Sequence, residues 1–435
     1  ASLTWDGTYL TAGSIKDSAL TSGRVTYAGA SGLLTDSANL LYSGTDLTVY
    51  GITVGRGAGA VSTNTAVGYN ALVANTTGDE LVSVGWSALS ANTTGGQNNA
   101  VGSQTLKSNT SGNYNTALGN KALYSNTTAS NNTAVGYQAA YTNTTGPKIT
   151  AIGYQAAKLL NNGGPNFGDT MVGYNSGASV STGIDNTFIG GQAGGPTTTG
   201  SSNVAVGSAA LYSNTIASNL TAIGYQALYT NTGGNSTAVG YQALKANTTG
   251  GSEAFGYQAL GANTTGASNN AFGLLTLSAN TTGSYNTAFG QQALIANTTA
   301  SANTAVGYQA GYSNTTGGYN TFHGMQSGFS NTTGINNTNI GYAANFSNST
   351  GNYNVSVGYQ SLNSNTASYN TAVGYQAGYG NTGGAVTFIG FQSGYSNTGA
   401  DNIALGADSF YSNTSGSSNT AIGRSALRSN TTASY

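Results

Sequence analysis

A glycine recurs at nearly constant spacing through most of this sequence, and its recurrence restricts the folds that the chain can adopt. It stands in motifs similar to A-V-G-Y-Q, with 22 copies between Gly68 and Gly423. The sequence offset between neighbouring copies is 17 in fifteen of the 21 intervals, 16 in five, and 20 between Gly153 and Gly173. A repeat this short cannot enclose its own core, so each copy must bury apolar residues against the next. The sequence therefore predicts a solenoid.

The composition excludes several classes of protein. Only 5% of the 435 residues are charged and the net charge is −1, so nothing favours binding to nucleic acid or to an anionic membrane surface. The chain has no cysteine, hence no disulfide and no thiolate metal site. It also has no apolar run long enough to span a bilayer and no signal-peptide pattern. The 66 glycines would suit a disordered segment, but 10% aromatic residues in strict register predict an ordered structure.

Residue types sort by their position relative to the recurring glycine, which we call the marker glycine. The residue before it is apolar in 21 of 22 copies and is Val or Ile in sixteen, a preference typical of a buried strand. The residue before that is usually Ala, with Phe188, Phe322 and Phe388 as large exceptions. Because strand neighbours point to opposite faces, two adjacent apolar columns predict that both faces are covered. One face should line the coil interior, and the other should pack against something outside the coil.

The residues after the marker glycine predict a close approach and a corner. The third residue after it is Ala, Ser or Thr in every copy, which indicates two backbones lying close together. The fourth is often Leu and should fill the coil interior. Asn stands seven positions after the glycine in 19 of 22 copies, usually before T-T-G or T-S-G. Asn and Gly tolerate positive φ, so this segment is the predicted corner, in which stacked amides form a ladder. The ladder residues include Asn75, Asn126, Asn214, Asn314 and Asn430.

We therefore expect an all-β fold, a parallel β-roll or β-solenoid of about 22 coils, whose handedness is left open. Each coil should contain two short strands, roughly N-T-A-V-G-Y and A-L-Y-S, joined by two turns. Around 159–169, extra residues and Pro165 predict one coil with a bulged loop. A coil this thin buries too little apolar area, at about 25 cal/mol per Å², to offset backbone ordering of about 1 kcal/mol or more per residue. A parallel homotrimer, which hides one face of every chain, solves this problem.

Catalytic and metal-binding groups are scarce, and we predict neither an enzyme nor a cofactor. The acidic pair Asp79 and Glu80 lies in a turn, and no P-loop lysine or helix pattern follows the glycine-rich segment 55–59. That segment is interpreted as a cap that closes the first coil. His323, the only histidine, stands in the apolar column before a marker glycine. Three such imidazoles would meet if that column faced a trimer axis, which makes His323 a weak metal candidate; a tolerated buried histidine is the alternative.

Tyrosines provide the candidate binding surface. One set directly follows the marker glycine, and a second stands two residues before the corner Asn. Each set should form a stripe of rings beside amides, a surface that suits sugars, although stacked rings could equally serve only to rigidify the ladder. The residues proposed for glycan binding are Tyr69, Tyr137, Tyr225, Tyr308 and Tyr375.

The string N-T-A-V-G-Y-Q-A, at 64–71 and again at 132–139, resembles the head repeat of trimeric autotransporter adhesins. The resemblance covers 64–435 and implies a left-handed parallel β-roll trimer. The family's repeat is shorter by two or three residues, and the extra residues here fall in the N-T-T-G corner, so the shape of the outer turn differs.

The segment from Gly23 to Leu40 and the Y-S-G-T-D-L-T-V-Y-G run after it are similar to strand-and-turn segments of phage tail fibres and other virion fibres. Such fibres often carry repeats of this kind and a C-terminal chaperone that is removed after assembly. The sequence shows no such chaperone, no coiled-coil stalk and no membrane anchor. We expect residues 1–60 to form a strand-and-turn segment with a cap and residues 61–435 to form the shaft.

The resemblance implies a structural protein of the virion, the trimeric shaft of a phage tail fibre that mediates host attachment. Its expected partners are its own copies, other tail proteins and host surface glycans, with no nucleic acid and no membrane insertion. The alternative is a bacterial cell-surface adhesin or an extracellular filament subunit. An ice-binding solenoid is disfavoured because the paired threonines lie in corners. In a secreted eukaryotic protein, corner sequons such as Asn109 would carry sugars.

Overall fold

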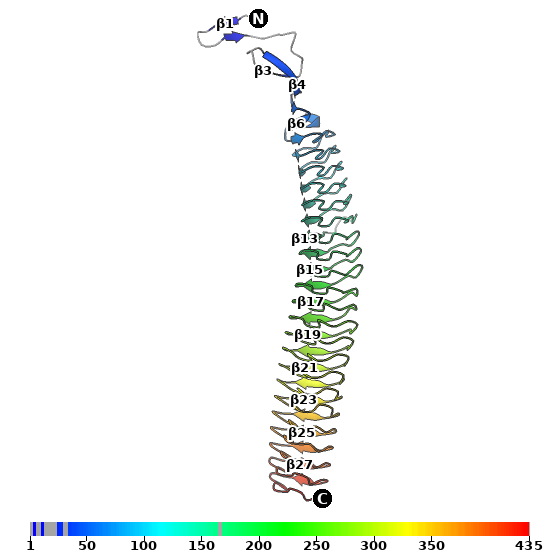
Figure 1. Cartoon of the computed structure of the whole chain (residues 1–435), viewed down its shortest axis with the longest axis vertical. Helices are drawn as coiled ribbons and strands as arrows, with labels where there is room; N and C mark the ends of the chain where they lie inside the picture. Colours follow the sequence, from blue (N-terminus) through cyan, green and yellow to red (C-terminus); the bar gives the residue numbers. More distant parts are fainter. Residues whose placement is uncertain (1–2, 6–9, 13–23, 29–33, 164–167, 435) are drawn as a thin grey trace. The chain divides into compact units, whose positions relative to one another are not determined.

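The computed structural model describes residues 3–5, 10–12, 24–28, 34–163 and 168–434. The chain forms two compact units, Ala1–Phe167 and Gly168–Tyr435. In both units the fold prediction is confirmed: the chain is an all-β parallel β-solenoid with one strand in each coil (Figure 1). Among the described residues, no helix has the length and apolar composition that a membrane span requires.

The first unit begins with antiparallel strands and continues as parallel coils. β1 pairs with β2, and β3 to β7 pair in sequence as an antiparallel sheet. From β7 to β12 each strand pairs in parallel, in register, with the strand one coil further on. The elements are β1 Leu3–Trp5, β2 Leu10–Ala12, β3 Arg24–Ala28, β4 Leu34–Tyr42, β5 Leu47–Val49, β6 Ile52–Gly55, the 3₁₀ turn η1 Ala58–Ala60, β7 Thr65–Gly68, β8 Val82–Val84, β9 Asn99–Val101, β10 Thr116–Leu118, β11 Thr133–Val135 and β12 Thr150–Ile152.

The second unit is a single parallel ladder from β13 to β28, in which every strand has three residues. Its strands are β13 Thr170–Val172, β14 Thr187–Ile189, β15 Val204–Val206, β16 Thr221–Ile223, β17 Thr237–Val239, β18 Glu253–Phe255, β19 Asn270–Phe272, β20 Thr287–Phe289, β21 Thr304–Val306, β22 Thr321–His323, β23 Thr338–Ile340, β24 Val355–Val357, β25 Thr371–Val373, β26 Thr387–Ile389, β27 Ile403–Leu405 and β28 Thr420–Ile422.

The cap predicted at 55–59 closes the edge of the first coil, chiefly through its backbone. β6 lies antiparallel to β7 and covers its free edge, with Val54 opposite Val67. The Asp46 carboxylate accepts hydrogen bonds from the backbone N–H groups of Arg56 and Gly57, which holds the segment in place. The backbone N–H of Ala58 then donates to Leu72 of the first coil over 3.1 Å. The domain boundary predicted at residue 60 falls between η1 and β7.

The prediction that each coil contains a second strand, at A-L-Y-S, is wrong. This segment is a series of turns in which alternate residues have positive φ, as at Gln258 (52°) and Leu260 (52°). It still bonds to the next coil, since the N–H of Leu260 donates to the carbonyl of Thr276 over 3.0 Å. The segment also contains tight turns that reverse the chain within the coil. One of them is closed by the N–H of Asn263, which donates to the carbonyl of Leu260 over 3.1 Å. The loop expected around Pro165 lies partly outside the described residues.

The marker glycine is required by its backbone conformation and by its neighbour. Gly290 has φ near +130°, a conformation that residues with side chains rarely adopt. A Cβ atom on Gly290 would stand 2.5 Å from the carbonyl oxygen of Gly307 in the next coil. The glycine therefore recurs because only glycine allows the coils to stack at this point.

The coil interior is filled by two facing columns of side chains. The inner column stands two residues before the marker glycine and is mostly Ala, as at Ala238 and Ala254; the opposing column stands four residues after it and is mostly Leu, as at Leu244 and Leu260. These side chains are fully buried, so the prediction that Leu fills the interior is confirmed at these positions. The opposing Leu427 is 46% exposed in the coil that contains β28.

Large and small residues compensate each other between these columns. Where the inner column has Phe388, the opposing column has Gly394 in the same coil and Gly378 in the coil before. A Cβ atom on Gly394 would lie 2.6 Å from atoms of the Phe388 ring. The same arrangement occurs at Phe188 with Gly177 and Gly194, and at Phe322 with Gly311 and Gly328. Each phenylalanine thus occupies the volume that leucines fill in other coils.

Candidate functional site

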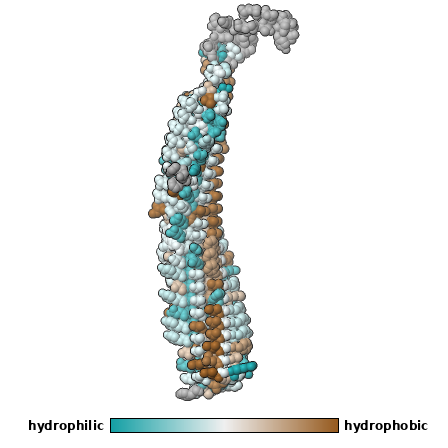
Figure 2. All heavy atoms as spheres, turned by 180° about the vertical axis from the view of Figure 1, so that it is seen from behind, coloured by the Kyte–Doolittle hydropathy of each residue, from teal (hydrophilic) through white to brown (hydrophobic). Residues whose placement is uncertain are grey.

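The outer face of the strands carries an apolar ridge, defined as the residues directly before the marker glycines. These side chains point away from the coil interior and are partly exposed. Ile189 and Ile223, for example, are each 39% exposed. Figure 2 shows the ridge as a brown stripe along the coils. In the second unit the rings of Phe255, Phe272 and Phe289 stack at 4.6 and 4.5 Å within it. The two apolar columns predicted from the sequence are therefore one interior column and one exposed column.

His323 lies on this ridge, at the end of β22, and is exposed. Its neighbours in the ridge are Val306 and Ile340, in register on β21 and β23. The alternative of a histidine inside the coil is wrong, because Phe322 takes the interior position. A site made of three imidazoles concerns an assembly of chains and stays a prediction. Within the described ranges of one chain, no three His, Asp or Glu side chains gather to hold a metal ion.

The corner asparagines form a buried ladder of amides. Nδ2 of Asn280 donates to Oδ1 of Asn263 over 2.7 Å, and Oδ1 of Asn280 accepts from Asn297 over 2.8 Å. The same Nδ2 also donates to the carbonyl of Gly283 over 2.9 Å, which holds the corner. Bonds of this ladder likewise join Asn75, Asn126, Asn314 and Asn430 to the corner asparagine of an adjacent coil, whereas Asn214 bonds only within its own corner, to Ala217.

A second buried column of asparagines was not predicted. It stands four residues before the marker glycine and begins the N-T-A-V-G string. Oδ1 of Asn269 accepts from the backbone N–H of Asn286 over 2.9 Å, and Nδ2 of Asn286 donates to the carbonyl of Ala300 over 2.9 Å. The signal was visible in the repeat, since an Asn that precedes a strand so regularly must satisfy backbone groups.

Replacing Asn280 with Ala should destabilise the second unit by about 2–4 kcal/mol, because buried partners in both adjacent coils and at Gly283 lose hydrogen bonds. Thr282→Ala in the same corner is the control: this side chain is exposed, so we expect a change within about 0.5 kcal/mol. Chemical denaturation followed by circular dichroism measures both. Equal stability of the two variants would mean that the amide ladder does not hold the corner.

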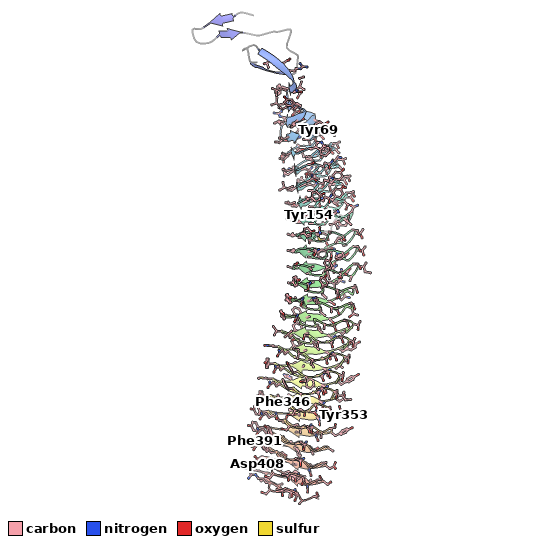
Figure 3. The ribbon with its side chains drawn as sticks, viewed as in Figure 1. Tyr69, Tyr154, Phe346, Tyr353, Phe391 and Asp408 are labelled. Carbon is pink, nitrogen blue, oxygen red and sulfur yellow. The ribbon has the colours of Figure 1, made fainter. Side chains whose placement is uncertain are left out.

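Aromatic side chains form three columns on the surface, of which two were predicted. Figure 3 labels members of all three: Phe391 directly after a marker glycine, Phe346 five residues after one, and Tyr353 five residues before one. The third column was missed and contains the most exposed rings of the three columns, with Tyr285 70% exposed. Its members are Tyr114, Tyr285, Tyr319, Tyr353 and Tyr369.

The rings stack on one another along the columns. Tyr359 and Tyr375 have ring centroids 5.2 Å apart, and Tyr225 and Tyr241 are 5.4 Å apart. Stacked rings leave no room for a sugar between their faces, so a continuous stripe offers edges and hydroxyl groups. The proposed glycan residues Tyr69, Tyr137, Tyr225, Tyr308 and Tyr375 are all exposed, and glycan binding by them stays a prediction.

One stack of tyrosines raises the pKa of its central phenol group. Tyr395 lies between Tyr379 and Tyr411, with centroid distances of 5.1 and 5.0 Å. Burial raises the pKa of Tyr395 above its ordinary value, and the neighbouring tyrosines add to the increase. The phenol therefore keeps its proton when the free side chain would lose it, and nothing in the stack resembles an activated catalytic group.

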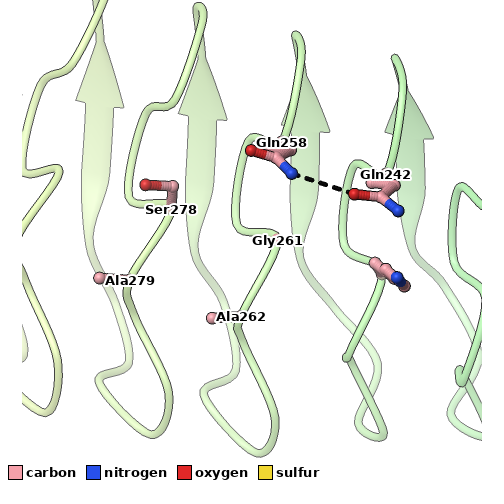
Figure 4. A pocket seen from close by; sticks show the side chains of 7 residues that line it. Gln242, Gln258, Gly261, Ala262, Ser278 and Ala279 are labelled. Atoms are coloured by element: carbon pink, nitrogen blue, oxygen red, sulfur yellow. Dashed lines mark hydrogen bonds between the residues drawn. The ribbon is translucent and has the colours of Figure 1, made fainter.

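A hollow of about 330 Å³ interrupts the second aromatic column (Figure 4). Gly261 and Ser278 stand where Tyr229 and Tyr312 stand in other coils. Gln242 and Gln258 line one side and are joined by a hydrogen bond of 3.0 Å, and Lys245 lines another. These amide, ammonium and hydroxyl groups can hydrogen-bond polar ligands, and the hollow contains no nucleophile with an adjacent base.

Comparisons with models of protein families, with curated proteins and with solved structures find no match for this chain.

Proposed function

We propose that the protein is a structural fibre protein, the shaft of a phage tail fibre or other virion fibre, in which three parallel copies pack along their apolar ridges. The observation that carries the proposal is the ridge itself. A side chain such as Ile189 or Ile223 stands at the same place in successive coils and is partly exposed. A regular apolar strip of this kind is typical of a surface that contacts another protein.

A second copy of the chain is the partner that fits the ridge best. Copies aligned in parallel place one apolar side chain opposite another in every coil, at the same spacing, whereas an unrelated surface has no such period. The ridge residues carry no formal charge when His323 is neutral, and the whole chain has a net charge of −1, so copies repel each other weakly. Three copies around one axis shield the ridge from all sides.

Energetics supports sharing of the ridge between chains. The interior of each coil holds little more than an Ala such as Ala238 and a Leu such as Leu244. Burial of apolar surface contributes about 25 cal/mol per Å², so a single coil gains little against the ordering of its backbone. Covering the ridge adds apolar burial in every coil without ordering more backbone.

The attachment role rests on the resemblance of the N-T-A-V-G-Y-Q repeats to fibre and adhesin repeats. The exposed tyrosines, such as Tyr285 and Tyr319, give the shaft an aromatic surface that suits contact with host glycans. The bacterial adhesin remains the second candidate, since the same repeat resembles adhesin heads.

Mass measurement of the native assembly tests the proposal. We expect three times the mass of the chain, and electron micrographs that show uniform fibres of limited length. A folded monomer would overturn the trimer and the shaft with it. Antibodies against the purified protein should label the tails of phage particles from the same source; labelling of a bacterial cell surface instead would favour the adhesin.

A further inference from the structure

One coil of the second unit, residues 338–354, has a polar interior. In the coil that contains β15, which follows the coil of Phe188, the interior pair is Ala205 and Leu211. In this coil, which follows the coil of Phe322, the same two positions are Asn339 and Asn345. Their side chains are 0% and 1% exposed, so two amides lie where the repeat otherwise places hydrocarbon.

These amides are not satisfied by protein atoms. Both Nδ2 and Oδ1 of Asn339 have no hydrogen-bond partner, and neither does Nδ2 of Asn345. Oδ1 of Asn345 accepts a bond of 3.3 Å from Asn365. Leaving such groups dry costs about 1–3 kcal/mol each.

The corner ladder is interrupted in the same coil. Asn348 donates to the carbonyl of Gly351 over 3.0 Å and accepts from its N–H over 2.9 Å, so it bonds within its own corner. Oδ1 of Asn331, in the coil before, consequently has no partner.

Gly328, in the coil before, lies beside the Asn339 amide. A Cβ atom on Gly328 would stand 3.1 Å from Nδ2 of Asn339. The backbone of Gly328 bonds to that of Asn331 over 3.1 Å and to that of Ala344, next to Asn345, over 2.9 Å. The interior of this coil therefore contains two unpaired donors, Nδ2 of Asn339 and Nδ2 of Asn345, and one unpaired acceptor, Oδ1 of Asn339.

We propose that this coil encloses ordered water, bound by the amides of Asn339 and Asn345. A cation would need acceptors alone and an anion donors alone, whereas water offers both to a mixed set. Two to four polar partners are what a buried water molecule uses. The site lies inside one chain, so it does not depend on the trimer or on the proposed function.

A high-resolution crystal structure of the full chain is the first test. We expect density for at least one water molecule within hydrogen-bond distance of the Asn339 amide. Direct bonding between the Asn339 and Asn345 amides, with no density between them, would overturn the proposal.

The double variant Asn339→Ala with Asn345→Leu is the second test, because it reproduces the interior that follows Phe188. We expect the water to be absent, hydrogen exchange of backbone amides in 321–362 to slow at least tenfold, and the thermal midpoint to rise. Ala205→Asn with Leu211→Asn is the matched reverse variant, which should speed exchange around β15. Unchanged exchange in both variants would contradict a hydrated interior.

Discussion

Replacing Phe255, Phe272 and Phe289 together with Asp should separate the proposed three-chain assembly into single chains. The three rings lie in successive coils of the ridge and stack at 4.6 and 4.5 Å. In a trimer, the substitution would put carboxylates from three chains around one axis in three successive layers. Like charges brought together in this way cost several kcal/mol, so association should weaken at least 100-fold, about 3 kcal/mol.

Sedimentation at micromolar concentration measures the change, and circular dichroism checks that the coils remain folded. The matched control replaces Tyr285, Tyr319 and Tyr353 with Asp. These are also exposed aromatic side chains, but they lie outside the ridge, so this variant should remain trimeric. If only the control dissociates, the chains contact each other through the tyrosine surface. If both variants remain trimeric, the contact between chains lies outside the three ridge rings.

The strand and the corner of each coil could be predicted because their residue types are restricted by simple rules. Ile223 and Val239, each directly before a marker glycine, are β-branched residues of the kind that strands favour. The Asn263 corner combines an amide with T-T-G, which is typical of a turn. Which apolar column faces inward could not be predicted, because Ala and Val are both compatible with either face.

The rest of the coil was mispredicted for a physical reason. Leu260 has φ of 52°, which is unfavourable for Leu, and its side-chain type gives no indication of it. The conformation is stabilised by the backbone bond to the next coil and by burial of the leucine side chain, which are effects of the stack as a whole. The missing tyrosines at Gly261 and Ser278 are visible in the repeat, but the hollow also depends on Gln242 and Lys245 in the neighbouring coil, which the sequence alone does not bring together.

Replacing Gly394 with Leu should destabilise the second unit by about 3 kcal/mol or more, although Leu is the commonest residue in the opposing column. A Cβ atom at this position would stand 2.6 Å from the Phe388 ring, which leaves no room for any side chain. Phe388→Ala alone should cost about 3–5 kcal/mol, because Gly394 and Gly378 leave the resulting cavity unfilled. The two single variants therefore fail for opposite reasons, overfilling and underfilling of the same volume.

The double variant Phe388→Ala with Gly394→Leu should recover most of the lost stability, since it restores the pair seen at Ala254 and Leu260. We expect a coupling energy of about 2–3 kcal/mol in a double-mutant cycle measured by chemical denaturation. Phe410→Ala, in the next coil, is the control, because its partner Ala404 is already small. Combining it with Gly394→Leu should give no comparable rescue. Additive losses in the first cycle would show that Phe388 and Gly394 do not share one space.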